Sequence, residues 1–120
     1  MTDEKEKILK RAIEHYGKSH QLSKCIEEVG EFLQAVGKYS ALAEKHKDWK
    51  KSSQGPATVG DTMFCEEIIQ AERHLQEEIA DAIITLQQMR LVYGPEHVDW
   101  WINFKLERLE DRMEREKKSV

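Results

Sequence analysis

Prolines are almost absent from this chain, and the two that occur, Pro56 and Pro95, divide its 120 residues into long uninterrupted stretches. Because proline ends or kinks a helix, such stretches leave room for long helices. Apolar residues recur at helical spacing within them, and no strand-like alternation of useful length occurs. The sequence therefore predicts an all-α protein that forms one domain over residues 1–120.

The first half of the chain predicts two helices. Apolar residues at i, i+4 spacing indicate an amphipathic helix over residues 3–17, ended by Gly17. A second helix, capped by Ser19 or Ser23, should run to about His46. Its apolar residues fall on one stripe at 3.6-residue periodicity, namely Leu22, Cys25, Ile26, Val29, Phe32, Leu33 and Val36.

Residues 47–60 are polar and contain the glycines and the proline that favour a loop. A loop of this length is unusual in a compact helical domain unless it has a function or is disordered. A long helix capped by Asp61 or Thr62 should follow and end near Gly94. A last helix, residues 96–118, opens with an acid and closes with basic residues, which suits the helix dipole. The fold class is thus a bundle of four to five helices.

The helix before Gly94 is apolar on more than one side. One face carries Leu75, Ile79, Ala82, Ile83, Leu86 and Met89, and another carries Ala80, Ile84 and Leu91. A helix with two apolar faces is buried on both. In so small a domain this indicates a subunit interface, and a deep position within one chain fits nearly as well.

The charge balance excludes several classes of protein. The chain has 19 Lys and Arg against 23 Asp and Glu, a formal net charge of −4, which offers no bulk attraction to nucleic acid or to an anionic membrane. No apolar run approaches the roughly 18 residues of a membrane span, and the charged N-terminus lacks the apolar core of a secretory signal. Cys25 and Cys65 are too few for a disulfide framework and are expected to be reduced core thiols. These features predict a soluble cytoplasmic protein.

Two acidic clusters stand out, one in each of the long expected helices. Glu28 with Glu31, and Glu78 with Asp81, are spaced i, i+3 and stack on one side of a helix, at the edge of its apolar stripe. If the helices pack antiparallel, four carboxylates can face one another across a groove. Their repulsion would be relieved by Mg²⁺ or Mn²⁺, which prefer oxygen ligands. On spacing alone, ordinary acidic helix flanks explain these residues as well as a metal site does.

The histidines argue against an iron centre. A di-iron carboxylate bundle needs Glu-x-x-His on two helices. None of the five histidines has an acid three positions earlier. The chain also has no Gly-rich phosphate loop.

The chain resembles the MazG-like all-α nucleoside triphosphate pyrophosphohydrolases in two segments, Leu22-Ser-Lys-Cys-Ile-Glu-Glu-Val-Gly-Glu-Phe-Leu and Glu78-Ile-Ala-Asp81. That superfamily carries Glu-Glu-x-x-Glu on one helix and Glu-x-x-Asp on a later one. A third segment, Asn103-Phe-Lys105-Leu-Glu-Arg108, resembles an Asn-x-Lys-x-x-Arg element whose basic groups meet the triphosphate. The resemblance covers roughly residues 15–110.

One departure from the family pattern concerns spacing. The 46 residues between Glu31 and Glu78 exceed the family's usual gap, and the loop at 47–60 accounts for much of the excess. A lid, an oligomer contact and a disordered excursion explain this insertion equally well. The departure puts the choice of substrate in doubt more than the metal site.

The resemblance implies an enzyme that uses Mg²⁺, or Mn²⁺ as a substitute, to hydrolyse a nucleoside triphosphate to the monophosphate and pyrophosphate, as house-cleaning enzymes of the nucleotide pool do. Its implied metal ligands are Glu28, Glu31, Glu78 and Asp81. Glu27 is a candidate for orienting or deprotonating the attacking water, and a plain surface acid explains it as well. The implied substrate-binding residues are Gln21, Asn103, Lys105 and Arg108.

A non-catalytic helical interaction module is the alternative to an enzyme. In that case the apolar stripes form a dimer and the acids only keep it soluble. Divalent metal should raise the melting temperature of the enzyme and leave the module almost unchanged. The doubly apolar helix and the resemblance both predict a homodimer or homotetramer. The preferred base and sugar stay open.

Overall fold

The computed structural model describes residues 1–52, 55 and 58–119, and these ranges contain helices and no strand. The helices are α1 (Asp3–Tyr16), α2 (Lys18–Ser52), α3 (Val59–Tyr93) and α4 (Pro95–Lys118). The prediction of an all-α chain is therefore confirmed. Among the described residues, none of the helices has the length and apolar character that crossing a bilayer requires.

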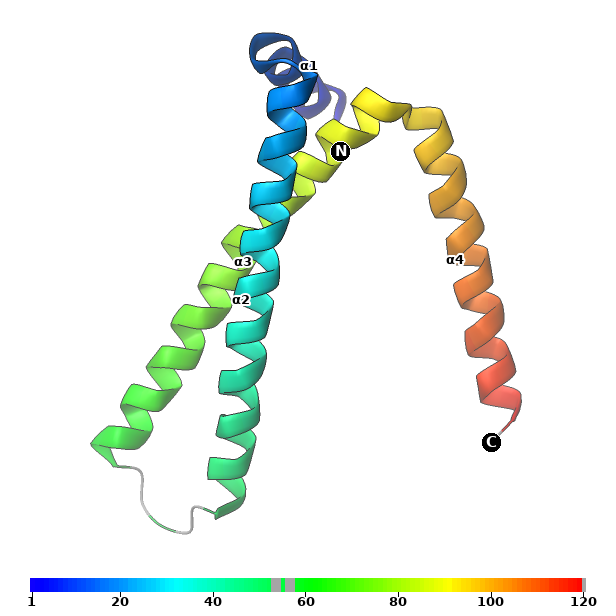
Figure 1. Ribbon diagram of the computed structural model, residues 1–120. Coiled ribbons are helices and arrows are strands. Elements are labelled where there is room, and N and C mark those ends of the chain that lie inside the picture. Colours follow the sequence, from blue (N-terminus) through cyan, green and yellow to red (C-terminus); the bar gives the residue numbers. More distant parts are fainter. Residues whose placement is uncertain (53–54, 56–57, 120) are drawn as a thin grey trace.

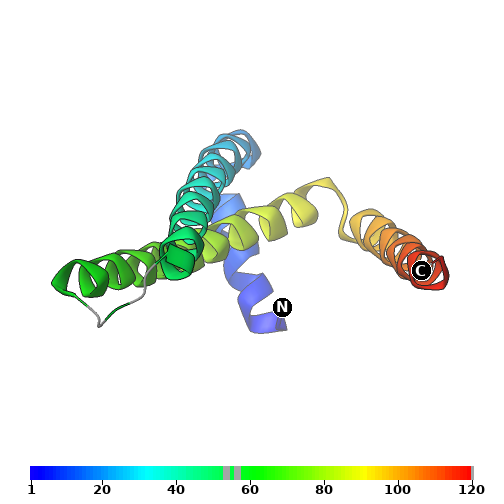
Figure 2. The same cartoon turned by 90° about the horizontal axis from the view of Figure 1, so that it is seen from below.

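Helices α2 and α3 form a long antiparallel hairpin, and α1 packs against both at the end where α2 begins (Figure 1). Helix α4 leaves the end of α3 and points away from the hairpin, as the second view also shows (Figure 2). Its contacts with other helices are with α3 alone. The fold therefore consists of a three-helix body and one helix that stands apart.

The connection between α2 and α3 is shorter than the loop expected at residues 47–60. Residues 47–52 continue α2 and residues 59–60 belong to α3. Residues 53, 54, 56 and 57 of the expected loop, Pro56 included, lie outside the described residues. The physical reason is that residues 47–52 contain neither glycine nor proline, so nothing in them ends α2 before Ser52.

Thr58, rather than the expected Asp61 or Thr62, caps α3. Its hydroxyl accepts a hydrogen bond from the Asp61 backbone N–H at 3.2 Å, and the Asp61 carboxylate accepts one from the Thr58 backbone N–H at 2.7 Å. This reciprocal pair is a capping box, which satisfies two donors that the helix itself cannot.

Gly17 joins α1 directly to α2, so neither Ser19 nor Ser23 serves as the cap predicted for the second helix. Its φ of +89° lies where side-chain-bearing residues are strained, and its N–H donates to the Ile13 carbonyl at 2.8 Å to close α1. Helix α2 then begins at the next residue.

The seam between α2 and α3 consists mostly of small and polar residues. From α2 the buried residues are Gln21, Cys25, Glu28, Ala35 and Leu42, and from α3 they are Ala71, Glu78, Ala82, Thr85 and Gln88. They recur every three, four or seven positions, the spacing of two helices in lengthwise contact. Small side chains at this spacing let the two helices approach closely, with the polar ones between them.

The expected apolar stripe of α2 does not coincide with this seam. Ile26 is 70% exposed and Leu33 is 64% exposed, whereas Glu28, expected at the edge of the stripe, is buried in the seam. Periodicity identifies the apolar face of a helix, and within the described residues that face is covered only in part, because Cys25 is buried and Val29 and Phe32 are half-buried. Cys25 is buried and Cys65 half-buried, and both are free thiols.

The chain is open for its length. A compact domain of 120 residues has a radius of gyration of about 14 Å, whereas this chain has 20.1 Å. None of the 24 residues of α4 is buried. Seven large apolar residues of α4 are exposed, namely Trp100, Trp101, Ile102, Phe104, Leu106, Leu109 and Met113.

Candidate metal centre

Three carboxylates meet across the seam near the middle of the hairpin. Glu28 and Glu31 of α2 and Glu78 of α3 each place an oxygen within 4.8 Å of the others. Glu28 and Glu78 belong to the seam and are 8% and 9% exposed, whereas Glu31, one turn further along α2, is exposed. The antiparallel packing of the two helices brings these acids together, as their spacing predicted.

Each seam carboxylate has one oxygen near a basic side chain of its own helix. Lys24 Nζ lies 3.0 Å from Glu28 Oε1, and His74 Nε2 lies 3.9 Å from Glu78 Oε1. The other oxygen of each, Oε2, is buried and has no hydrogen-bond partner among the described residues. An unpartnered buried polar atom costs about 1–3 kcal/mol, and more when it is charged.

A divalent cation fits this arrangement chemically. The three donors are all carboxylate oxygens, which suit Mg²⁺ and Mn²⁺ rather than metals that prefer nitrogen or sulfur. A cation among them would supply the partner that the two buried Oε2 atoms lack. Glu28, Glu31 and Glu78 are therefore the residues that could hold a metal.

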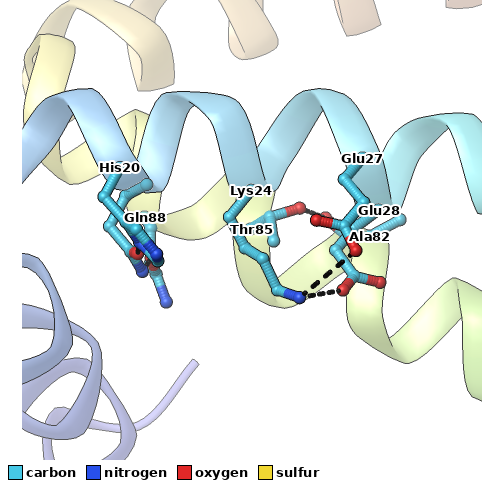
Figure 3. A network of polar contacts seen from close by, with 8 residues as sticks. His20, Lys24, Glu27, Glu28, Ala82, Thr85 and Gln88 are labelled. Carbon is cyan, nitrogen blue, oxygen red and sulfur yellow. Dashed lines mark hydrogen bonds and ion pairs between the residues drawn. The ribbon is translucent and has the colours of Figure 1, made fainter. Parts of the chain in front are cut away.

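The electrostatics of the cluster also favour a cation. The negative charge of Glu28 raises the pKa of Glu31 above its usual value, and loss of hydration and the charge of Glu78 act in the same direction. Lys24 neutralises the cluster in part, because its Nζ lies 3.0 Å from Glu28 Oε1. The same Nζ also lies 3.7 Å from Oε1 of Glu27, the residue beside the cluster (Figure 3). The hydrogen bond to Glu28, followed by the charge of Glu27, raises the pKa of Lys24.

Asp81 does not join the three-carboxylate group, although it was predicted as a fourth ligand. It lines an adjoining pocket of about 460 Å³ together with Glu27 and Glu28. Its side chain is one methylene shorter than that of glutamate, and it lies one turn beyond Glu78 toward the end of α3. The structure thus brings three of the four predicted ligands together and places Asp81 beside them.

No family model, curated protein or solved structure matches the chain. The motif residues and their placement therefore carry the functional argument.

The predicted substrate-binding residues fall into two groups. Gln21 is buried in the seam, two turns before Glu28. Asn103, Lys105 and Arg108 lie on α4, are exposed, and are absent from the pockets that the acids line. Arg108 packs over the Phe104 ring, 5.8 Å from its centroid. Within one chain, α4 does not reach the carboxylates (Figure 1).

Sequence reasoning missed two polar residues of the seam, Thr85 and Gln88. Both are buried and line the pocket beside Glu28. A signal was present, because Thr85 follows Glu78 by seven residues, just as Glu28 follows Gln21 by seven. Polar residues that recur at the spacing of a helix seam lie on the same face as one another.

Proposed function

We propose that this protein is a Mg²⁺-dependent nucleoside triphosphate pyrophosphohydrolase that acts on the cytoplasmic nucleotide pool. The observation that carries the proposal is the pair of buried carboxylate oxygens of Glu28 and Glu78, two members of the three-carboxylate cluster, which have no hydrogen-bond partner among the described residues. Such oxygens are stabilised by a cation. The motif resemblance to MazG-like enzymes points to the same residues, with Asp81 at the rim.

Bound Mg²⁺ would neutralise the triphosphate and make a water molecule acidic enough to attack the α-phosphorus. The water oxygen would form a bond to the α-phosphorus. The bond between the α-phosphorus and the oxygen that bridges to the β-phosphorus would break, and pyrophosphate would leave. Glu27 is exposed beside Glu28 and lines the same pocket, so it is the proposed acceptor of the water proton. Lys24 lies 3.0 Å from one oxygen of Glu28 and would restrict the movement of this carboxylate.

A homo-oligomer is part of the proposal. A compact monomer of this mass exposes about 6,700 Å², whereas this chain exposes 9,704 Å². The excess is about 3,000 Å² per chain, or about 6,000 Å² for two chains, which is at the upper end of the interface areas that obligate oligomers bury. Apolar side chains on α2, α3 and α4 account for part of it, including Ile26, Ile83 and Leu109.

The oligomer also bears on substrate binding. Lys105 and Arg108 stand on a helix that points away from the carboxylates of its own chain (Figure 2). If these basic groups meet a triphosphate held at the metal centre, they belong to the α4 helix of a second copy. Asn103, on the same helix, would be placed in the same way.

A non-catalytic interaction module remains the second candidate. It is favoured by one observation, the seven exposed large apolar residues on α4, which serve oligomerisation whether or not the acids bind metal. The two candidates predict different roles for Glu78: the enzyme needs its carboxylate as a metal ligand, and the interaction module does not.

The test is pyrophosphate release from a panel of ribo-, deoxy- and modified nucleoside triphosphates, with Mg²⁺ or Mn²⁺ and with chelator. We expect chelator-sensitive turnover that falls about 100-fold or more in Glu78→Gln, because a metal ligand is lost. Glu77→Gln is the matched control, since Glu77 is an exposed neighbour outside the cluster. It should keep the wild-type rate.

The melting temperature distinguishes the candidates independently of substrate. A metal present at 100 times its dissociation constant stabilises the folded state by about 2.7 kcal/mol. We expect this shift in the wild type and in Glu77→Gln and its loss in Glu78→Gln. Equal melting temperatures with and without metal in the wild type, together with no turnover, would leave the interaction module as the function.

A further inference from the structure

A pocket adjoins the metal centre and shares Glu28 with it. It lies between α1, α2 and α3, has a volume of about 460 Å³, and is lined by Tyr16, His20 and Gln88 among others. This is within the range of pockets that hold small ligands. Its polar side chains follow one another along the seam, from His20 and Gln88 to Glu27 and Glu28 (Figure 3).

The amides in this pocket form a chain of hydrogen bonds. His20 Nδ1 lies 2.8 Å from Gln21 Oε1, and the hydrogen bond between them forms in the tautomer whose Nδ1 carries the hydrogen. Gln21 Nε2 in turn donates to Gln88 Oε1. The oxygen of Gln88 is thereby used, and its Nε2 group keeps two N–H donors with no recorded partner among the described residues.

Gln21 and Gln88 are 5% and 6% exposed as residues, and Gln88 lines the floor of the pocket, where its Nε2 donors can meet a ligand. A donor that a bound ligand shields from water without pairing it costs about 1–3 kcal/mol. The pocket floor therefore favours a ligand edge that presents acceptors and disfavours one that presents a donor.

The opposite part of the pocket offers a flat aromatic surface. The Tyr16 and His20 rings stack on each other with centroids 4.9 Å apart and an interplanar angle of 17°. Tyr16 is largely exposed and lines the pocket, which leaves part of its ring free to stack on a planar ligand.

The distance to the metal centre suits a nucleotide. Gln21 and Glu28 are seven residues apart on α2, or about 10 Å along the helix axis. A planar base at the amide end and phosphates at the carboxylate end would thus occupy two neighbouring sites joined by the sugar.

We propose that this pocket is a base-binding subsite in which the Gln88 amide selects keto bases over amino bases. Guanine presents two acceptors, O6 and N7, on one edge, and uracil and thymine present O4. Adenine and cytosine carry an amino donor at the corresponding positions, which would face the donors of Gln88. The inference rests on the proposed function, because it names the substrate class of the same site.

The test measures two quantities for each of four deoxynucleotides, with guanine, thymine, adenine and cytosine as bases. One is the dissociation constant of the monophosphate in the presence of Mg²⁺, and the other is kcat/KM for pyrophosphate release from the triphosphate. In the wild type we expect keto bases to be favoured about tenfold or more in both quantities.

Gln88→Glu changes the donor into an acceptor and should invert the preference toward adenine and cytosine. Gln88→Leu should reduce the preference to about one. Gln76→Glu adds the same charge at an exposed position of α3 and should keep the wild-type preference. The melting temperature of each variant shows whether it is folded.

The outcomes separate this inference from the proposed function. Base-selective binding without any pyrophosphate release would leave the subsite in place and overturn the enzymatic proposal. Turnover with equal or amino-favouring constants in the wild type would overturn the subsite, as would an unchanged preference in folded Gln88→Glu. Failure of all four monophosphates to bind would overturn the subsite as well.

Discussion

Glu78 illustrates how an acidic side chain can lower stability until a ligand arrives. One of its oxygens is buried without a partner, and the carboxylates of Glu28 and Glu31 lie within 4.8 Å. In metal-free protein this arrangement costs free energy twice, through lost hydration and through repulsion. The same features become favourable when a cation is present.

Glu78→Gln should therefore be more stable than the wild type in the presence of chelator. The amide removes one negative charge from three carboxylates that lie within 4.8 Å of one another, which should stabilise the folded state by about 1 kcal/mol. Thermal melting with chelator measures the difference, and Glu77→Gln serves as the control. A lower melting temperature than the wild type would contradict this account of the cluster.

Asp99 carries a second ionic contact, which ties the start of α4 to the body. Arg90 donates to both Asp99 oxygens, at 2.7 and 2.6 Å, and to Glu6 at 3.1 Å. The hydrogen bonds from Arg90 hold the pKa of Asp99 below its ordinary value of 3.8. A carboxyl with a lowered pKa in the folded state stabilises the fold above its ordinary pKa, and this stability is lost as the pH falls through the folded value.

Asp99→Asn should consequently be less stable than the wild type at pH 7, and the difference should shrink as the pH falls below about 4. Urea unfolding of both proteins across this range measures it. Asp111→Asn, an exposed acid on the same helix, is the control. A difference that persists unchanged to low pH would show that Asp99 acts through packing rather than charge.

At this scale the sequence predicted the three clustered acids and missed their neighbours. Glu28, Glu31 and Glu78 were found because acids repeat at i, i+3 in a recognisable motif. Gln88 belongs to no recognisable motif, because glutamine is common on any helix surface. Only its burial and its hydrogen bond with Gln21 distinguish it from a surface residue. Asp81 was placed in the cluster because helical phase alone does not report the reach of a side chain.

At the scale of elements, the start of α3 depends on local chemistry that a single residue can remove. The Thr58 hydroxyl satisfies the Asp61 N–H, and no other side chain is recorded at that donor. Thr58→Ala should lower the free energy of unfolding by about 1 kcal/mol. Chemical denaturation measures this, and Thr58→Ser, which keeps the hydroxyl, should restore most of it. Equal stability of the alanine and serine variants would contradict the cap.

Helix type and order were predictable from periodicity, and helix ends were less so. Residues 47–52 were assigned to a loop because most of them are polar, yet the segment continues α2, with Trp49 half-buried near Phe64 of α3. Ser19 and Ser23 were expected to cap the second helix. In the structure Gly17 ends α1 and α2 begins at the next residue, so both serines lie within α2. Such junctions depend on the backbone angles of one residue, which composition does not reveal.

At the scale of the whole molecule, the exposed apolar faces determine the expected assembly. Leu109 is 44% exposed on a helix without a buried residue. We expect the wild type to be a dimer or a tetramer and Leu109→Glu to shift it toward smaller species, because a charge in an apolar interface is costly. Light scattering at micromolar concentration measures the mass. Glu114→Lys, at an exposed position about 140° around α4 from Leu109, should leave the assembly unchanged.

The separation of α4 from the body could not be predicted from the sequence. Its apolar residues have helical spacing, which is equally compatible with packing inside one chain. The apolar faces of α3 were assigned either to a subunit interface or to a deep position within the chain, and Ile83 and Ile84 are exposed in the single chain. Periodicity shows which face of a helix is apolar. Only the arrangement of the helices shows whether another helix of the same chain packs against that face.

The direction of α4 depends on one backbone joint. Gly94, with a φ of +115°, lies between the last residue of α3 and Pro95, the first of α4. Helix α4 is about 36 Å long, so a turn of roughly 10° at this joint moves its far end by about 6 Å. Small changes in two dihedral angles would thus redirect the apolar face over a wide arc. In the proposed oligomer a single glycine would thereby set the rotation that relates one copy to the next, and with it the symmetry in which the assembly closes.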